Sequence, residues 1–245
     1  MIIHILTLFP EVFEPIFNSS IIKRAQNKKL AKIKVYNLRD WAINKHGTVD
    51  DRPYGGGAGM ILKVEPIYQA IKDIKGKAKS KNLKTFLLSP KGKIFNQALV
   101  QELSGLKEIL LICGHYEGFD ERIRQFVDGD ISIGDYVLTG GEIPAMAITD
   151  AIIRLIPGVL KKPEATKAES FSVHLNQLAQ KTLPQGQDGR KLSNNTSYFL
   201  EYPQYTRPEK FKGLTVPKVL LSGNHQKISQ WQKENIKKKK TPKKN

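Results

Sequence analysis

Three glycine-bearing stretches of the chain could together form a ligand pocket. They lie at 87–92, 112–118 and 133–142, and each begins in an apolar segment typical of a strand and then runs into a turn. In open α/β sheets, ligands bind beyond the carboxyl ends of the strands. Loops of this kind offer backbone N–H and C=O groups, which can hydrogen-bond the edges of a purine. Glycine is also common in ordinary turns, so a purely structural role stays open.

A fourth glycine-rich segment, Asp50–Met60, holds four glycines at positions 55, 56, 57 and 59. It has neither the Lys-Ser/Thr pair of a phosphate-binding P-loop nor the glycine spacing of a dinucleotide-binding fingerprint. Two interpretations remain open. Either the segment is a flexible surface loop, or its backbone passes close to another chain or a ligand, which glycine permits.

The other reactive side chains indicate no metal site and no nucleophile. The five histidines lack metal-ligand spacing. The single cysteine, Cys113, lies in an apolar run and is expected to be a buried small hydrophobic residue. Trp41 and Trp231 are expected to be packing residues. Arg154 interrupts an apolar helix candidate, where its charge needs a partner or a function unless it faces the surface.

These segments must be positioned by the elements around them. Expected strands lie at 2–8, 33–38, 86–88 and 109–113, and expected helices at 21–28, 64–74, 95–103, 121–127 and 144–156. This alternation predicts that 1–160 form an α/β domain with a parallel, helix-covered sheet. A polar, partly disordered linker is expected over 161–197, followed by a small unit over 198–245 that ends in a Lys-rich tail.

The formal net charge of +17 favours a polyanionic partner, and nucleic acid is the usual one. No apolar run is long enough to cross a membrane, and the first ten residues show no secretory signal. A single cysteine excludes an internal disulfide, so a reducing, cytoplasmic location is expected.

Taken together and in order, these segments resemble the TrmD family of bacterial tRNA (guanine-N1)-methyltransferases. The matching motifs are spread over 1–225. They are ILTLFP at 5–10, DRPYGGGAGM at 51–60, LSP at 88–90, CG at 113–114, YEG at 116–118, DER at 120–122, SIGDYVL at 132–138, GGE at 140–142, PA at 144–145, IPGVL at 156–160, YPQYTRP at 202–208 and LLSGNH at 220–225.

The resemblance implies a SPOUT-type α/β fold with a C-terminal trefoil knot in the sheet domain, one of the rare exceptions to unknotted connections. It also implies a small, mostly helical C-terminal domain that binds tRNA. Members of the family are homodimers with the active site at the subunit interface. They use S-adenosyl-L-methionine to methylate N1 of the guanine directly 3′ of the anticodon, tRNA position 37.

The resemblance assigns catalysis to two residues, Glu169 and Arg154. Glu169 would take the N1 proton as the general base, and Arg154 would stabilise the negative charge that develops on guanine O6. Glu117 also matches a position that the family uses near the guanine. The methyl donor is expected to lie against Leu88, Ser89, Pro90, Gly114, Tyr116, Glu117, Ile133, Gly134, Asp135, Tyr136, Val137, Leu138, Gly140, Gly141 and Pro144.

The chain departs from the family pattern at several positions. Glu169 stands where the family has Asp, His115 where Arg is usual, and Lys91 where Gln is usual. The segment 172–204 is longer than usual, and the C-terminal unit is shorter. Asp135 is the alternative general base. Two other functions remain open, a SPOUT methyltransferase that acts on another RNA and a non-catalytic RNA-binding protein that kept the fold.

Overall fold

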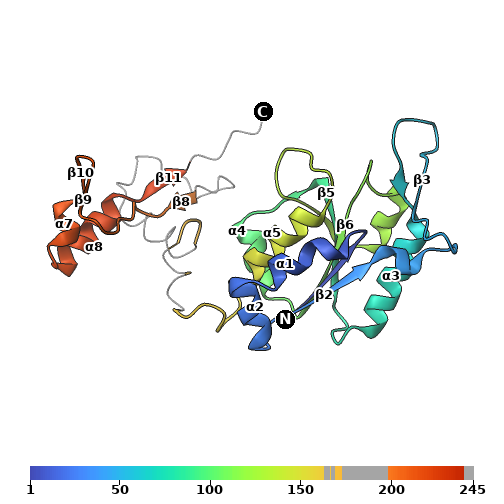
Figure 1. Ribbon diagram of the computed structural model, residues 1–245, viewed down its shortest axis with the longest axis horizontal. Coiled ribbons are helices and arrows are strands. Elements are labelled where there is room, and N and C mark those ends of the chain that lie inside the picture. Colours follow the sequence, from blue (N-terminus) through green and yellow to red (C-terminus); the bar gives the residue numbers. More distant parts are fainter. Residues whose placement is uncertain (163–165, 167–168, 173–197, 240–245) are drawn as a thin grey trace, which may run out of the picture. The chain divides into compact units, whose positions relative to one another are not determined.

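The computed structural model describes residues 1–162, 166, 169–172 and 198–239 (Figure 1). The chain divides into two compact units, Met1–Lys161 and Lys162–Asn245. The predicted linker at 161–197 lies almost entirely outside the described residues, as does the end of the Lys-rich tail. No helix in the described part of the chain is long and apolar enough to span a membrane.

The first unit is built on a five-stranded sheet in the order β2-β1-β6-β5-β7, and every neighbouring pair is parallel. The central strand β6 is buried along its whole length, which is typical of a parallel sheet covered on both faces. The predicted parallel α/β architecture is therefore confirmed. The strands are β1 (Ile2–Thr7), β2 (Lys32–Asn37), β5 (Lys84–Ile94), β6 (Glu108–Cys113) and β7 (Gly129–Ser132).

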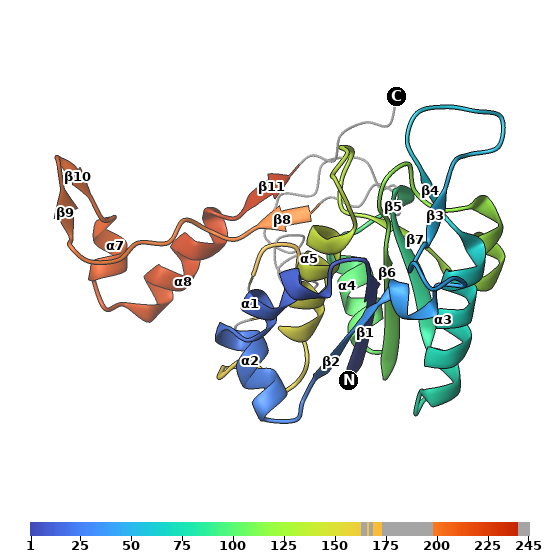
Figure 2. The same cartoon turned by 45° about the vertical axis from the view of Figure 1, so that its right-hand side comes forward.

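Helices cover both faces of this sheet, and alternate residues of the strands point into two separate cores (Figures 1 and 2). Ile109 and Leu111 of β6 pack into the first core, whereas Leu110 and Ile112 pack into the second. The first core is covered by η1 (Pro10–Phe13), α1 (Glu14–Phe17), α2 (Ser20–Asn27), α4 (Gln97–Ser104) and α5 (Glu142–Ile153). The second is covered by η2 (Leu38–Trp41), α3 (Val64–Lys77) and η3 (Glu121–Phe126).

The turn residues after 86–88 predicted that this strand ends at Leu88, but the strand continues beyond it. Strand β5 resumes beyond an irregularity, so that Leu88 and Lys93 both pair with Ile131 of β7. The four residues between them leave the ladder and return to it. A Cβ on Gly92 would lie 2.5 Å from the Ile131 nitrogen, so only glycine allows the chain to come back against β7.

Two helix predictions were wrong in detail. The segment at 121–127 forms the 3₁₀ helix η3, because Asp120 caps it and the chain must enter β7 only two residues after it ends. Helix α5 ends at Ile153, so Arg154 is its C-cap and does not lie within the helix. A cation at that position faces the unsatisfied carbonyls of the helix end.

The second unit contains short strands as well as helices. Strand β8 (Tyr198–Leu200) pairs antiparallel with β11 (Lys237–Lys239), and the buried Phe199 packs against Ile236. The start of the Lys-rich tail therefore forms a strand, which was not predicted from the sequence. Trp231 packs near Tyr202 and Tyr205, with ring centroids 6.3 Å away in each case. The other elements are β9 (Lys210–Phe211), β10 (Leu214–Thr215), α7 (Lys218–Leu221) and α8 (His225–Glu234).

His4 is a buried titratable group within the sheet, and its environment disfavours the protonated ring. Its ring is 1% exposed, stacks on Tyr36, and places Nδ1 3.0 Å from the Tyr36 hydroxyl, while its Nε2 has no hydrogen-bond partner among the described residues. Burial, with the nearby charge of Lys34, lowers the pKa of His4 to about 4. Protonation therefore favours the unfolded chain, where the pKa of histidine is about 6.5.

We expect the stability that comes from neutral His4 to be complete above about pH 6.5 and to be lost as the pH falls toward 4. Between pH 7 and pH 4.5, the free energy of unfolding of a His4→Gln variant should fall by about 2 kcal/mol less than that of the parent. Urea unfolding at the two pH values measures this difference. Parallel losses in the two proteins would show that His4 does not cause the acid sensitivity.

Candidate functional site

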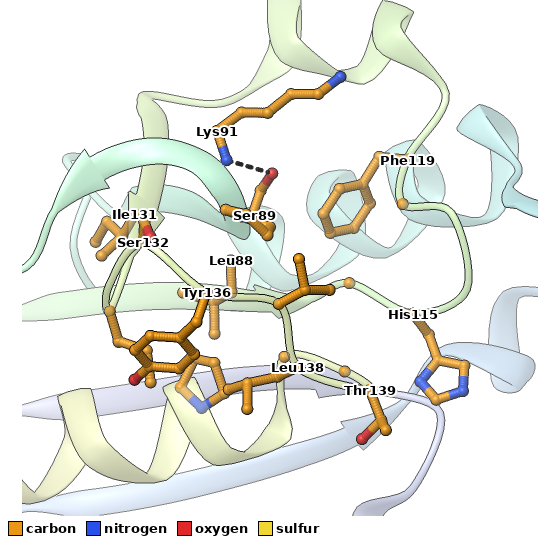
Figure 3. Close-up of a pocket in the computed structure, with 18 of the residues that line it drawn as sticks. Leu88, Ser89, Lys91, His115, Phe119, Ile131, Ser132, Tyr136, Leu138 and Thr139 are labelled. Carbon is orange, nitrogen blue, oxygen red and sulfur yellow. Dashed lines mark hydrogen bonds between the residues drawn. The ribbon is translucent and has the colours of Figure 1, made fainter.

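A pocket of about 250 Å³ lies at the carboxyl ends of β5, β6 and β7 (Figure 3). Three loops meet there, 88–91 after the first part of β5, 114–119 after β6, and 131–141 at the end of and after β7. Pro144 from the first turn of α5 completes the wall. The structure thus brings together the three glycine-bearing stretches, at the sheet edge where α/β proteins bind ligands.

Of the residues predicted to contact the donor, Asp135 is the only one that does not line this pocket. Its side chain is exposed, and its roles as a donor contact and as the alternative base stay predictions. The predicted residues that do line it are Leu88, Ser89, Pro90, Gly114, Tyr116, Glu117, Ile133, Gly134, Tyr136, Val137, Leu138, Gly140, Gly141 and Pro144.

Several lining residues were not predicted. Four of them lie inside the three stretches, and the other three, Phe119, Ile131 and Ser132, directly adjoin them, because a loop that encloses a ligand contributes neighbouring residues as well as its glycines. They are Lys91, His115, Gly118, Phe119, Ile131, Ser132 and Thr139.

The glycines of the pocket serve contacts between its own loops. The Gly141 N–H donates to the Gly114 carbonyl at 2.8 Å, and a Cβ on Gly141 would lie 2.6 Å from the Cys113 Cα. A Cβ on Gly114 would lie 3.0 Å from the Leu88 carbonyl oxygen. These glycines let main chain pack against main chain, so a larger residue would move the walls themselves and would not merely fill the space of a ligand.

Side-chain hydrogen bonds hold the first and third loops in shape. Ser132 Oγ donates to the Gly134 carbonyl at 2.9 Å and lies 3.2 Å from the Gly134 nitrogen, which donates to it. Ser89 Oγ accepts from the Lys91 N–H at 3.3 Å, the bond drawn in Figure 3. Some polar groups of these loops therefore form hydrogen bonds within the loops themselves and stabilise their conformation.

Cys113 lies beneath the pocket and is buried, as expected from its apolar run. Burial raises the pKa of its thiol well above the ordinary value, and the nearby Glu142 carboxylate adds to the rise. Glu142 is itself held by the Thr7 hydroxyl, which donates to Oε1 at 2.7 Å. A thiol kept protonated in this way is unreactive.

A wider groove of about 840 Å³ adjoins the pocket and shares Lys91, Glu117 and Phe119 with it. Its other walls come from the base of the glycine-rich segment, the start of α3, and the segment 119–122. Arg122 pairs with Asp120 at 2.6 Å, and this bond lowers the pKa of the carboxyl group. The groove is thus a polar surface next to a largely apolar pocket.

The glycine-rich segment joins β3 (Asp50–Asp51) to β4 (Ile61–Leu62) and reaches beyond the sheet (Figure 2). At Gly55 and Gly56 the backbone φ is positive and nothing surrounds the Cβ position, as in a surface loop. At Gly59 a Cβ would lie 2.7 Å from Oε1 of Glu117. The surface-loop interpretation therefore fits Gly55 and Gly56, whereas the close approach at Gly59 is to a side chain of the same chain, and contact with a ligand or another chain stays a prediction.

The two predicted catalytic residues belong to different units. Arg154 is half-buried at the end of α5 in the first unit and does not line the pocket. Glu169 is half-buried in the second unit, where its carbonyl accepts a hydrogen bond from the Ser172 N–H at 3.1 Å. Among the described residues, no cluster of three or more His, Cys, Asp or Glu side chains could hold a metal ion.

Comparison with known proteins identifies relatives of the whole chain. The family model described as "tRNA (Guanine-1)-methyltransferase TrmD" matches residues 1–245. A tRNA (guanine-N(1)-)-methyltransferase of Dictyoglomus turgidum is 48% identical over 237 residues, which cover 97% of this chain and 85% of that protein. The corresponding protein of Carboxydothermus hydrogenoformans is 51% identical over 235 residues, covering 96% of this chain and 82% of its own length.

A solved structure shows the same similarity in three dimensions. The crystal structure of the tRNA (m1G37) methyltransferase from Aquifex aeolicus matches with a TM-score of 0.72 and 36% identity, covering 96% of this chain and 88% of that chain. The sequence and the fold agree in this assignment. The chain belongs to the TrmD family of tRNA (guanine-1)-methyltransferases.

Proposed function

We propose that this protein transfers the methyl group of S-adenosyl-L-methionine to N1 of the guanine directly 3′ of the anticodon in tRNA. The observation that carries the proposal is the pocket of three backbone loops in a chain that belongs to the TrmD family. A cytoplasmic location accords with such a substrate. Action on another RNA has no specific observation in its favour, and RNA binding without catalysis is favoured only by Glu169 in place of the family's Asp.

The pocket fits the adenosine part of the methyl donor. Leu88, Ile133, Leu138 and Pro144 provide apolar walls, and the loops between them expose backbone N–H and C=O groups that can bind the edge of a purine. When bound, the donor supplies an electrophilic methyl group on a positively charged sulfur. The chain's own contribution is to hold that methyl group in line with guanine N1.

The reaction requires a base and a stabiliser of negative charge. Guanine N1 carries a proton at neutral pH, and the proton must leave as the N1–methyl bond forms and the sulfur–methyl bond breaks. Glu169 takes this proton on its carboxylate. The electron density left on O6 is stabilised by Arg154, whose guanidinium stays charged at every relevant pH.

The finer features of the fold form part of the proposal. The return of β5 against β7 at Gly92 accords with a trefoil knot formed by the pocket loops. The second unit, with the basic segment Lys237–Asn245, binds the tRNA backbone through salt-dependent contacts. Its helices α7 and α8 make up the helical part of a small C-terminal domain.

A homodimer with the active site between its subunits is supported by exposed apolar side chains near the pocket. Val137 in the third loop is 84% exposed, and Ile143 in the first turn of α5 is 58% exposed. Val12 and Ile16 on η1 and α1 are also exposed, and η1 packs against α5. Exposed apolar side chains gathered on neighbouring elements are typical of an interface.

If this surface is the dimer interface, an Ile143→Glu variant should be a monomer, because a carboxylate cannot be buried unpaired. Light scattering coupled to size-exclusion chromatography measures the mass. An Ile94→Glu variant, also at an exposed apolar residue of the same unit, should stay dimeric. A parent protein that is already a monomer would contradict the proposed dimer.

A substitution at Gly141 tests whether the pocket depends on the close contact between its backbone and that of Cys113. A Gly141→Ala variant places a Cβ against the backbone of Cys113 and should abolish calorimetric binding of S-adenosylmethionine and lower the melting temperature. In Gly76→Ala the new Cβ meets nothing within 4 Å, so donor binding should persist and stability should rise by up to about 1 kcal/mol. Undiminished donor binding in Gly141→Ala would contradict the backbone contact as the basis of the site.

Glu169 tests the mechanism. Glu169→Gln should lower single-turnover methylation by about 10² to 10⁴ and leave donor binding unchanged, because the residue acts on the guanine. Labelled donor and a tRNA with guanine 3′ of the anticodon provide the assay. The same tRNA with adenine there, and ribosomal RNA, should accept no methyl group. Methylation by Glu169→Gln at the parent rate would mean that another group is the base.

A further inference from the structure

A row of exposed lysines lies at the amino ends of the strands, at the edge of the sheet opposite the pocket. The pocket occupies the carboxyl ends, and all five strands are parallel, so the two edges lie at opposite ends of the strands (Figure 2). The loops 28–31, 78–83 and 105–107 enter β2, β5 and β6 at this edge. The amino-edge lysines are the exposed lysines of these loops and of the adjoining ends of α3, β2 and β5, namely Lys28, Lys29, Lys32, Lys75, Lys77, Lys79, Lys81, Lys84 and Lys107.

Hydrogen bonds of the sheet join these loops into one surface. Lys32 of β2 pairs with Ile2 of β1, and Ile2 pairs in turn with Glu108, the first residue of β6. The Ile2 N–H also donates to the Lys107 carbonyl at 2.9 Å, and β5 begins with Lys84 on the far side of β6. From β2 to β5 the edge therefore spans roughly 14 Å at the usual spacing of strands. A double helix of nucleic acid carries on the order of eight phosphates over that length.

Most of the positive charge at this edge is not neutralised by the described part of the chain. Among the described residues, Lys84 is the only amino-edge lysine that forms an ion pair, with Asp128 at 2.7 Å. Lys75 and Lys77 lie in the last turn of α3, where a cation interacts favourably with the helix end. The lysines beyond that turn gain nothing from α3, and their mutual repulsion favours the binding of an anion.

The loop 78–83, which carries two of these lysines, is anchored by a buried carboxylate. Glu108 is 3% exposed, and its two carboxylate oxygens accept the N–H groups of Lys79 at 3.2 Å and Ser80 at 3.3 Å. A buried carboxylate is tolerated when hydrogen-bond donors reach it, and these two donors belong to the loop. Leu83 is also buried, whereas the side chains of Lys79 and Lys81 are exposed. The anchor therefore fixes the backbone that presents these two ammonium groups to solvent.

The side chains at this edge favour a double helix over other partners. No large hydrophobic side chain is exposed there among the described residues. Protein interfaces have an apolar core in which lysine is depleted, and surfaces that bind membranes insert apolar side chains. Single-stranded nucleic acid is bound by aromatic side chains that stack on its bases. A double helix keeps its bases stacked inside and presents its phosphates, so lysines alone can bind it.

We propose that the amino-edge lysines bind the phosphate backbone of double-helical RNA. RNA is the nucleic acid of the proposed function, but this inference goes beyond that function. The surface is a second RNA contact, at the opposite edge of the sheet from the pocket, and it makes no use of the target guanine. Lysine contacts to phosphates carry no sequence information, so the surface accepts RNA helices irrespective of their sequence.

The test uses a blunt RNA duplex of about 20 base pairs, which has no anticodon loop, at salt concentrations between about 50 and 200 mM. Fluorescence anisotropy measures its binding to the full chain. Lys79→Gln/Lys81→Gln should weaken this binding about tenfold and reduce the slope of log K against log salt by about 2. The single-turnover rate of methylation and the KM for tRNA should stay at the parent values, because neither lysine lines the pocket or the groove.

Two matched variants separate the effect of charge from the effect of position. Lys79→Arg/Lys81→Arg keeps both charges and should bind the duplex as the parent does. Lys45→Gln/Lys93→Gln removes the same charge from exposed lysines that lie outside the amino edge and line neither cavity. Its duplex binding should also match that of the parent.

Three results would overturn the inference. Lys79→Gln/Lys81→Gln could bind the duplex as tightly as the parent does. Lys45→Gln/Lys93→Gln could lose as much binding as the amino-edge variant, which would assign the effect to net charge alone. An equal loss of duplex binding and of apparent affinity for tRNA in methylation would place Lys79 and Lys81 in the substrate site. A parent protein that binds the duplex but methylates no tRNA would instead refute the proposed function and leave this inference standing.

Discussion

Main chain lies directly against main chain at the ends of the strands that form the pocket, and the pocket depends on that contact. Gly141 approaches the end of β6, and Gly92 approaches β7, each at a distance that no Cβ would tolerate. The loops are consequently extensions of three core strands and are positioned by the sheet. A site built on such rigid elements keeps its geometry better than one built on independent loops.

The polar and reactive side chains that lie below this backbone contact take no part in the proposed reaction. Directly below the pocket, the Cys113 thiol is buried and its pKa is raised, while Thr7 and Glu142 bond to each other. None of these groups is needed for methyl transfer as proposed. The floor is therefore inert, and the proposed chemistry depends on the donor, the RNA and the two proposed catalytic residues, Arg154 and Glu169.

The sequence predicted the strands that are continuous apolar runs, because burial on both faces leaves no room for polar residues. β7, with the sequence GDIS, lacks such a run and was not identified as a separate strand. The end of β5 was misjudged because Pro90 and Gly92 are turn residues that here form an excursion within a strand. Local propensity cannot reveal that a neighbouring strand receives the returning chain.

The position of the pocket could be predicted from the sequence because glycines are concentrated in the three loops that form it. The three stretches carried a visible signal, and nearly all of their predicted residues line one pocket. Asp135 does not line the pocket, and within a loop nothing in the sequence tells which side chains face inward. Glu169 has no local signal of its own and could be named only through a family resemblance, since a carboxylate in a polar segment is ordinary.

The proposed RNA substrate favours a positively charged protein, whereas the proposed cationic donor favours a pocket without net positive charge. A net charge of +17 attracts a polyanion such as tRNA, yet the proposed donor carries a positively charged sulfur and would be repelled by a basic pocket. In the pocket, the single Lys is balanced by a single Glu, and the rest of its lining carries no formal charge apart from any on the His115 ring. At the groove, Lys63 and Arg122 are each paired with a carboxylate. A strongly basic protein can therefore admit a cationic donor if positive charge is cancelled locally, at the pocket proposed to bind the donor, and the excess lies elsewhere on the chain.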